Sequence, residues 1–366
     1  MLQQSLAFHD GQSFSMEDLL PCFPSTRYQG SKRKLLPFIY RVCEGYDFES
    51  VLDLYSGTAS VSLLFRSMGK SVTANDYMQY NASTARLMLS ADHSALCGID
   101  IDCLVSDVFR DGNPAFNSVE IEFEGIYFTQ EENRQIDRFC SNIVDYNGVE
   151  KDLLIYLMGQ AMLMKRPYNL FHRANLHMRT KDVPRSFGNA KTWESSFEKH
   201  MISLFRKLIK FPFDGRPGKS VCINTQNLDQ FDAEPDFLYL DPPYLNKKKV
   251  AVDYAGFYHF LDGLIDYDLF KKGNVKSPHK PIVNSTSRWK TREGGLEEIR
   301  DIIKRWPKAI VAISYRGDGE PSIEDLKQVL GGAGYLVENH QAMDYKYALS
   351  KSSNTTEDII IGIPPR

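Results

Sequence analysis

One stretch of eight residues constrains the fold more than any other part of the chain. Residues 237–244 read Phe-Leu-Tyr-Leu-Asp-Pro-Pro-Tyr, so four apolar residues lead directly into an acid, two prolines and an aromatic. The apolar run is typical of a parallel strand buried on both faces. The prolines end it, because they fix φ and carry no backbone donor. We therefore predict that Asp241 lies at the carboxyl end of a central strand, where open α/β sheets bind their ligands.

The turn after this strand presents a carboxylate, a carbonyl and an aromatic face together. These groups belong to Asp241, Pro242, Pro243 and Tyr244. Two acceptors suit the N–H groups of an exocyclic amine, and an aromatic ring suits stacking on a planar base. The alternative is an ordinary strand that ends in a proline turn. We favour a catalytic site, because the acid directly follows a buried strand.

Length, charge and cysteine usage exclude several classes of protein. The 366 residues suffice for one large α/β domain with an insertion, or for two domains. The formal net charge is -3, so any surface that binds nucleic acid must be local. The six cysteines form no CxxC pair, which argues against a zinc site or a disulfide framework. We expect no metal, no signal peptide and no membrane span.

Two predicted strands each end in an acid. Residues 50–54 form the first strand, and a glycine turn and an amphipathic helix follow it. Residues 70–74 form the second, and Asp76 follows it about twenty residues after Asp53, at the spacing of an acid that binds a ribose. Either acid alone could be a cap or turn residue. The ordered pair favours a cofactor that carries a ribose.

A basic turn precedes both strands. Residues 27–34 read Arg-Tyr-Gln-Gly-Ser-Lys-Arg-Lys and lead into a helix. A Gly-Ser turn at a helix start leaves free N–H groups beside basic side chains, which suits a carboxylate. The alternative is a solvated basic helix start.

These motifs, in this order, resemble those of the N6-adenine DNA methyltransferases of the Dam/DpnM type, the D12 class or alpha-group. The motifs are Arg-Tyr-Gln-Gly-Ser-Lys at 27–32, Asp-Leu-Tyr-Ser-Gly-Thr at 53–58, Asn-Asp-Tyr at 75–77 and Asp-Pro-Pro-Tyr at 241–244. The resemblance covers residues 26–82 and 221–363. One departure is Ala59, where the family has a second glycine. A methyl group there would crowd the cofactor loop.

The resemblance implies a fold and a division into domains. The fold is an α/β, Rossmann-like S-adenosylmethionine-dependent methyltransferase fold. It has a mostly parallel seven-stranded sheet with an antiparallel edge hairpin, and a helical insertion that recognises the DNA target. Residues 1–24 would be an N-terminal extension, residues 25–82 and 221–366 the catalytic domain, and residues 83–220 the insertion.

The resemblance also implies S-adenosylmethionine as cofactor, with S-adenosylhomocysteine as product, and it assigns binding residues. Those expected near the methionine part are Tyr28, Gln29, Gly30 and Lys32. Those expected in the cofactor loop are Asp53, Tyr55, Ser56, Gly57 and Thr58. Asp76 would hold the ribose and Tyr77 would lie against the adenine. Asn227 and Leu228, after the third strand, would meet the adenine edge.

Residues 83–220 are too long for a loop, so we expect a helical insertion with helices over 131–143 and 152–164. Within residues 165–191, seven lysines and arginines face one acid, and aromatics and amides lie between them. Such a mixture suits phosphates and base edges, and the alternative is a solvated basic loop. The residues that we expect to bind DNA are Arg173, Asn175, Arg179 and Lys181, together with Lys247 and Lys248 after the proline turn.

We therefore predict a site-specific methyltransferase that acts on the N6 amine of an adenine flipped out of double-stranded DNA. Asp241 and the Pro242 carbonyl would accept the amine protons, and Tyr244 would stack on the base. Family resemblance implies a bacterial or phage source, cytoplasmic action at the nucleoid, and a cognate restriction endonuclease as a candidate partner. The alternatives are cytosine N4 methylation, RNA adenine methylation, or a non-catalytic DNA-binding or specificity subunit of the same fold.

Overall fold

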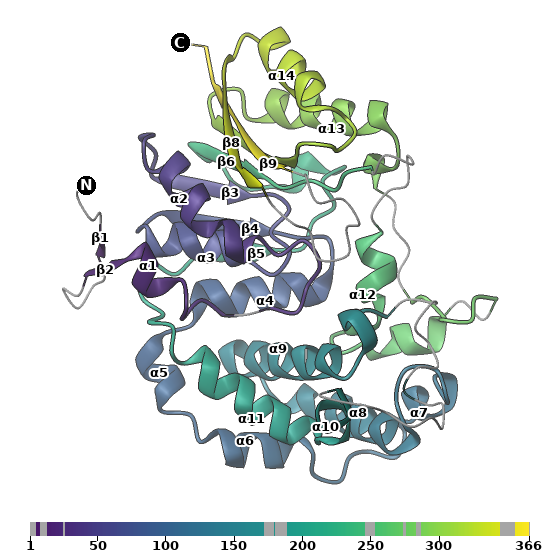
Figure 1. Ribbon diagram of the computed structural model, residues 1–366. Coiled ribbons are helices and arrows are strands. Elements are labelled where there is room, and N and C mark those ends of the chain that lie inside the picture. The colour runs from purple at the N-terminus through teal and green to yellow at the C-terminus, as the bar shows by residue number, and fades with distance from the viewer. Residues whose placement is uncertain are drawn as a thin grey trace.

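The computed structural model describes residues 5–7, 13–24, 26–171, 179, 189–245, 253–273, 276–282, 287–344 and 356–365. A layered α/β body forms one end of the molecule and a helical lobe the other (Figure 1). The chain enters through a short hairpin, β1 (Ser5–Ala7) and β2 (Ser13–Ser15), and helix α1 (Met16–Leu19).

The α/β body is built on a seven-stranded sheet of order β5-β4-β3-β6-β7-β9-β8. Strands β5, β4, β3, β6 and β7 are parallel, whereas β9 and β8 form an antiparallel hairpin at one edge. The bounds are β3 Ser50–Asp53, β4 Ser71–Asn75, β5 Lys219–Val221, β6 Phe237–Leu240, β7 Ile310–Arg316, β8 Leu336–Asp344 and β9 Thr356–Ile363. This confirms the predicted fold class, with the predicted strand β6 in the middle of the sheet.

Helices cover both faces of the sheet, because alternate side chains of its central strands point to opposite sides. Val51 and Phe237 pack with one group of helices, and Leu52 and Leu238 pack with the other. The first group comprises η1 Lys32–Leu35, α2 Leu36–Cys43, α3 Ser60–Ser67 and α4 Gln79–Ser90. The second comprises η5 Leu228–Gln230, η7 Arg288–Lys290, α13 Arg292–Arg305 and α14 Ile323–Gly332. The two apolar cores therefore hold β6 from both sides.

The helical lobe lies between β4 and β5 in the chain. Its elements are α5 His93–Cys97, α6 Ile101–Val108, α7 Ser118–Glu122, α8 Gln130–Asn142, η2 Ile143–Asp145, α9 Gly148–Met164, η3 Pro167–Asn169, α10 Asn189–Glu194 and α11 Phe197–Leu208. The expected helices over 131–143 and 152–164 correspond to α8 and α9. Helix α4 packs on both the sheet and α9, so residue 83 falls inside a helix that joins the two parts.

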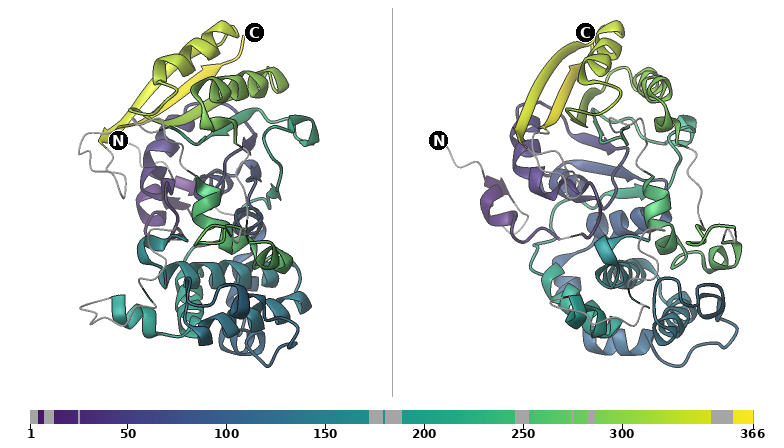
Figure 2. Two further views of the ribbon diagram at one scale, coloured as in Figure 1. Left: turned by 90° about the vertical axis from the view of Figure 1, so that its right-hand side faces the viewer. Right: turned by 45° about the vertical axis from the view of Figure 1, so that its right-hand side comes forward.

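The chain that follows β6 returns to the lobe. Helix α12 (Tyr254–Asp262) lies at the junction of sheet and lobe, and η6 (Tyr267–Lys272) follows it (Figures 1 and 2). The Phe171 amide donates to the Phe257 carbonyl at 2.9 Å. The lobe is therefore completed by segments of the chain that come before and after β6. No helix among the described residues is long and apolar enough to cross a membrane.

Candidate active site

A cavity of about 1220 Å³, its solvent-filled mouth included, opens where the parallel strands end. Strands that run in one direction bring their carboxyl ends to the same edge of a sheet. The residues after β3, β4, β5 and β6 therefore meet in this cavity. The predicted residues on its wall are Tyr28, Gln29, Gly30, Lys32, Asp53, Tyr55, Ser56, Gly57, Thr58, Asp76, Tyr77, Asp241 and Pro243.

Asp241 lies directly after β6, and a buried lysine approaches it. Lys32 Nζ lies 2.9 Å from Asp241 Oδ1 and 2.7 Å from Glu357 Oε1. Burial raises the pKa of Asp241 to about 6, with Lys32 lowering it and Glu357 raising it. Burial lowers the pKa of Lys32, but the two carboxylates outweigh this effect and hold it well above its ordinary value. Lys32 therefore stays an ammonium beside Asp241.

The basic turn is held in place by aromatic rings. Tyr28 stacks on Tyr258 of α12, with ring centroids 4.0 Å apart, and the Gln29 amide donates to the Tyr258 hydroxyl at 2.6 Å. Gly30 has a φ of 83°, and a Cβ there would come within 2.8 Å of the Tyr254 hydroxyl. Glycine is needed here because the left-handed conformation and the close ring both exclude a side chain. The turn consequently delivers Lys32 into the cavity.

The two acids that end β3 and β4 are both buried. Asp76 accepts the Gly57 amide at 3.0 Å and the Met78 amide at 2.8 Å, so it ties the glycine turn to the second strand. Asp53 Oδ2 accepts the Ser62 hydroxyl at 2.6 Å. Burial raises the pKa of Asp53 to about 7 and that of Asp76 to about 6. Both carboxylates are therefore shielded from water, and hydrogen bonds rather than a neighbouring cation compensate for the lost hydration.

Several buried polar atoms of the cavity have no hydrogen-bond partner among the described residues. They are Gln29 Oε1, Asp53 Oδ1, Ser56 Oγ and the Tyr239 hydroxyl. The cavity wall also carries more acids than bases: Asp53, Asp76, Asp241, Asp253 and Glu298 against Lys32 and Lys290. Orphaned acceptors in an acidic cavity suit a cationic ligand with amine and hydroxyl groups. A ligand with a sulfonium, an ammonium and a ribose, such as S-adenosylmethionine, fits this donor and acceptor set.

The third strand contributes different residues from those expected. Ile223, Asn224 and Thr225 line the cavity, whereas Asn227 and Leu228 are not on its wall. Strand β5 ends at Val221, so the chain reaches the cavity immediately after the strand and leaves it before Asn227. The segment after the third strand therefore borders the cavity with residues a few positions earlier than Asn227, and the assignment of Asn227 and Leu228 to the cofactor stays a prediction.

The cavity residues that the sequence reasoning missed include Asp253, Tyr254, Trp289 and Glu298. Glu298 Oε1 accepts the Tyr55 hydroxyl at 2.5 Å, the Thr225 hydroxyl at 2.6 Å and the Trp289 indole at 3.1 Å. This cluster joins the cofactor loop to α13. The sequence gives little indication of these residues, because each is a single acid or aromatic within a segment that is typical of a loop or an amphipathic helix.

The remaining residues of the Asp-Pro-Pro-Tyr turn support it from outside the cavity. Pro242 is buried. Tyr244 packs edge-on against Tyr315 with centroids 6.4 Å apart, and the Arg316 guanidinium lies 5.4 Å from its ring centroid. Neither Pro242 nor Tyr244 belongs to the cavity wall in this structure.

Ala59 adopts the conformation that its family position favours for glycine. Its φ is 58° and its ψ is 25°, in the left-handed region, directly before α3. The methyl group is fully buried. The chain therefore keeps the turn of the cofactor loop at the expense of local backbone strain.

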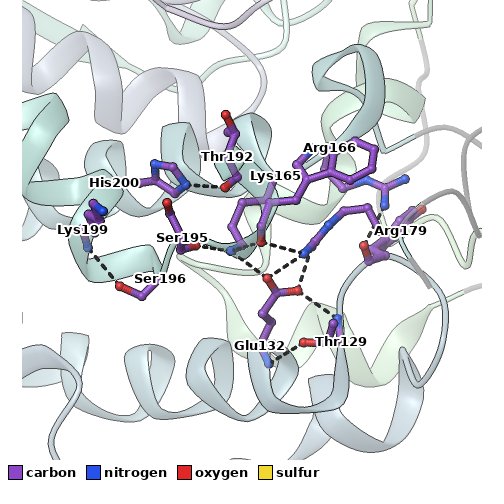
Figure 3. A network of polar contacts seen from close by, with 12 residues as sticks. Thr129, Glu132, Lys165, Arg166, Arg179, Thr192, Ser195, Ser196, Lys199 and His200 are labelled. Carbon is purple, nitrogen blue, oxygen red and sulfur yellow. Dashed lines mark hydrogen bonds and ion pairs between the residues drawn. The ribbon is translucent and has the colours of Figure 1, made fainter. Parts of the chain in front are cut away.

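Arg179 is the one predicted DNA-binding residue among the described residues, and it is buried. Its guanidinium donates to both Glu132 oxygens at 2.7 Å, and Lys165 Nζ lies 2.8 Å from Glu132 Oε1 (Figure 3). A DNA contact by this guanidinium would require the ion pair to open. The residues Arg173, Asn175, Lys181, Lys247 and Lys248 lie outside the described residues.

Comparison with known proteins agrees with the geometry of the site. The model of the D12 class N6 adenine-specific DNA methyltransferases matches residues 28–288. The chain is also 26% identical over 330 residues to the type II methyltransferase M2.HphI of Haemophilus parahaemolyticus, which covers 87% of this chain and 90% of that protein. The matched family model begins at the basic turn and ends beyond the Asp-Pro-Pro-Tyr turn. The chain belongs to the D12 class N6 adenine-specific DNA methyltransferases.

Proposed function

We propose that this DNA adenine methyltransferase acts on a flipped adenine whose amine is held by Asp241. The observation that carries the proposal is the half-buried Asp241 carboxylate on the wall of an acidic cavity at the carboxyl end of β6. The amine of a paired adenine is hidden in the duplex, so the base must leave the stack before transfer. Membership of the family supports adenine over cytosine and RNA as the target.

In this mechanism the Asp241 carboxylate and the Pro242 carbonyl accept hydrogen bonds from the two amine N–H groups, and the Pro242 carbonyl must turn toward the cavity to do so. These hydrogen bonds draw the nitrogen lone pair out of conjugation with the ring and direct it toward the methyl donor. The carboxylate also stabilises the positive charge that develops on the amine. Tyr244 would stack on the flipped base, a contact worth roughly 1–3 kcal/mol; this requires its ring to turn from Tyr315 toward the cavity. Positioning supplies much of the remaining rate enhancement, and no metal takes part.

S-Adenosylmethionine, when bound, supplies an activated methyl group on a sulfonium. Asp76 would bind its ribose hydroxyls, and Asp53 and Gln29 would bind its amine. Tyr77 and Thr225 would border its adenine. The orphaned Asp53 Oδ1 and Gln29 Oε1 support this assignment, because each lacks a partner among the described residues.

We also propose that residues 83–220 carry target recognition and that the basic segment 165–191 contacts DNA. The segment holds seven basic residues, whereas the whole chain has a net charge of -3. Similarity to a type II methyltransferase further supports a cognate restriction endonuclease as partner. Its DNA substrate would keep the enzyme at the nucleoid, in the cytoplasm.

The test is methyl transfer from labelled S-adenosylmethionine to unmethylated genomic DNA, with the product nucleosides identified by mass. We expect N6-methyladenine from the wild-type enzyme. Asp241→Ala should make no product but still bind S-adenosylmethionine in calorimetry. N4-Methylcytosine as product would overturn the target base, and an active Asp241→Ala variant would overturn the mechanism.

A further inference from the structure

A buried carboxylate that the mechanism has not used lies behind the catalytic residue. Glu357 belongs to β9, where it pairs in register with Arg316 of β7. It is fully buried, and its Oε1 lies 2.7 Å from Lys32 Nζ. The Ser314 hydroxyl, also buried, donates to the same oxygen at 2.6 Å. Strand β9 of the edge hairpin therefore places the Glu357 carboxylate against Lys32, close to the end of β6.

The Lys32 ammonium lies between two carboxylates that come from different strands. It touches Asp241 Oδ1 at 2.9 Å and Glu357 at 2.7 Å. Among the described residues, no hydrogen bond or ion pair reaches Asp241 Oδ2. A lysine ammonium is a point charge on a flexible stem, so one partner alone does not fix its position. Because Glu357 holds the ammonium from the other side, the ion pair of Lys32 with Asp241 is directed to Oδ1 rather than Oδ2.

We propose that Glu357 is a positioning residue for methyl transfer. It holds the Lys32 ammonium on Asp241 Oδ1, so that Asp241 Oδ2 stays open toward the amine of the target adenine. Glu357 acts only through Lys32 and touches neither substrate nor cofactor. The inference rests on the proposed role of Asp241 and adds a residue that the Asp-Pro-Pro-Tyr motif does not contain.

The charges around Asp241 make the proposal measurable. The titratable groups that face Asp241 are Lys32 of η1, Asp53 of β3, Tyr239 of β6, Tyr254 of α12 and Glu357 of β9. Burial is the largest cause of the raised pKa of Asp241, and the Glu357 carboxylate raises this pKa further. Removing its charge should therefore lower the pH at which Asp241 is protonated.

The test is Glu357→Gln, which keeps the size of the side chain and removes its charge. We expect kcat to fall about tenfold, with KM for DNA and S-adenosylmethionine binding by calorimetry unchanged. The acid limb of the kcat profile should move to lower pH, because the Glu357 charge raises the pKa of Asp241. The matched control is Asp358→Asn, which removes the next buried acid of β9 and should leave kcat and the profile unchanged.

A double-mutant cycle separates positioning from a merely structural role. In a Lys32→Met background Glu357→Gln should have no further effect on kcat at a pH well above the acid limb, because the contact through which Glu357 positions Asp241 is gone. Its charge can then still move the acid limb, but not the plateau. An equal effect in both backgrounds, or an acid limb that does not move, would overturn the proposal. If Glu357→Gln does not fold, Glu357→Asp withdraws the carboxylate by one methylene. The proposal then requires a loss of kcat that disappears in the Lys32→Met background, and a persistent loss would overturn it.

The same experiments distinguish this inference from the proposed function. Wild-type N6-methyladenine formation with an inactive Asp241→Ala variant establishes the function on its own. An unaltered Glu357→Gln variant in that setting overturns only the inference. A wild-type enzyme without adenine product overturns the function first, whatever Glu357→Gln does.

Discussion

The Lys32 ammonium lies 2.9 Å from Asp241 Oδ1, and this contact joins the basic turn at the start of the fold to the end of β6. The turn was expected to serve the cofactor, and the proline turn to serve the base. Their contact means that the charge state of Asp241, which we propose binds the base, depends on Lys32 of the basic turn. The first prediction tests this coupling through pH.

For the wild-type enzyme we expect kcat to fall as the pH drops through about 6, since burial raises the pKa of Asp241 to about 6. Below that pH the carboxyl group is protonated and no longer stabilises positive charge on the amine. Lys32→Met removes a cation that lowers this pKa, so the acid limb should move upward and turnover at pH 7 should fall. Kinetics between pH 5 and 9 measure both effects.

The control for this prediction is Lys34→Met, which removes an exposed lysine from the same basic turn. Its pH profile should match that of the wild type. A Lys32→Met enzyme with an unmoved acid limb would show that the ion pair does not set the charge of Asp241.

The second prediction concerns Asp53, whose buried Oδ1 has no partner among the described residues. The raised pKa, about 7, means that the folded protein binds a proton that the unfolded chain releases. Stability linked to Asp53 is therefore lost as the pH rises from its ordinary pKa through about 7. Asp53→Asn should stabilise the cofactor-free protein by roughly 1–3 kcal/mol at pH 8, and by less at pH 5.

The same substitution should weaken S-adenosylmethionine binding at least tenfold, because a polar group kept unpaired in the free protein serves the ligand. Thermal unfolding at both pH values and calorimetry measure the two effects. Asp111→Asn, at an exposed position, should change neither. A destabilised Asp53→Asn protein at pH 8 would contradict the argument.

The third prediction uses the left-handed conformation of Ala59, with its φ of 58°. A non-glycine residue in this region costs about 1–2 kcal/mol, whereas a glycine costs roughly 0.5–1 kcal/mol in lost chain entropy. Ala59→Gly should therefore leave the free energy of unfolding unchanged or raise it slightly. Ala161→Gly, in the buried interior of α9, should lower it by about 1 kcal/mol or more. Urea denaturation of both variants measures their free energies of unfolding. If both variants lose the same amount of stability, the backbone at Ala59 is not strained.

The strands and the four motifs were predictable because each is local. Residues 237–240 are continuously apolar, and an acid follows them, so both the buried strand and the position of Asp241 can be predicted from eight letters. Glu357 and Glu298 could not be found in this way. Each reaches the site through tertiary packing, from β9 or α13, and nothing in the sequence around them distinguishes them from solvated acids. Asn227 and Leu228 lie off the cavity wall for a smaller reason, since strand ends are the least certain part of such a prediction.

The last prediction concerns the clasp of Glu132, Lys165 and Arg179, in which one buried carboxylate holds two buried cations (Figure 3). Burial raises the pKa of Glu132, but the ion pairs with Arg179 and Lys165 outweigh it and hold the pKa below its ordinary value. Removing one member of a buried ion pair leaves an uncompensated charge and costs about 3–5 kcal/mol. Glu132→Gln should therefore lower the free energy of unfolding by roughly that amount, as measured in urea.

The matched control is Glu131→Gln on the same helix, where the exposed carboxylate pairs only at the surface with Arg134. An exposed pair is worth about 0–1 kcal/mol, so this variant should unfold almost as the wild type does. Lys165 and Arg179 both belong to the basic segment that we propose for DNA contact, so Glu132 anchors that segment at two points. Glu132→Gln should therefore release the segment and weaken DNA binding, while S-adenosylmethionine binding stays unchanged. A gain in DNA affinity would show instead that the ion pair withholds Arg179 from DNA. If Glu132→Gln costs no more than Glu131→Gln, the clasp does not stabilise the lobe. If its stability falls but DNA affinity does not, the clasp holds the lobe together without orienting the DNA-binding segment.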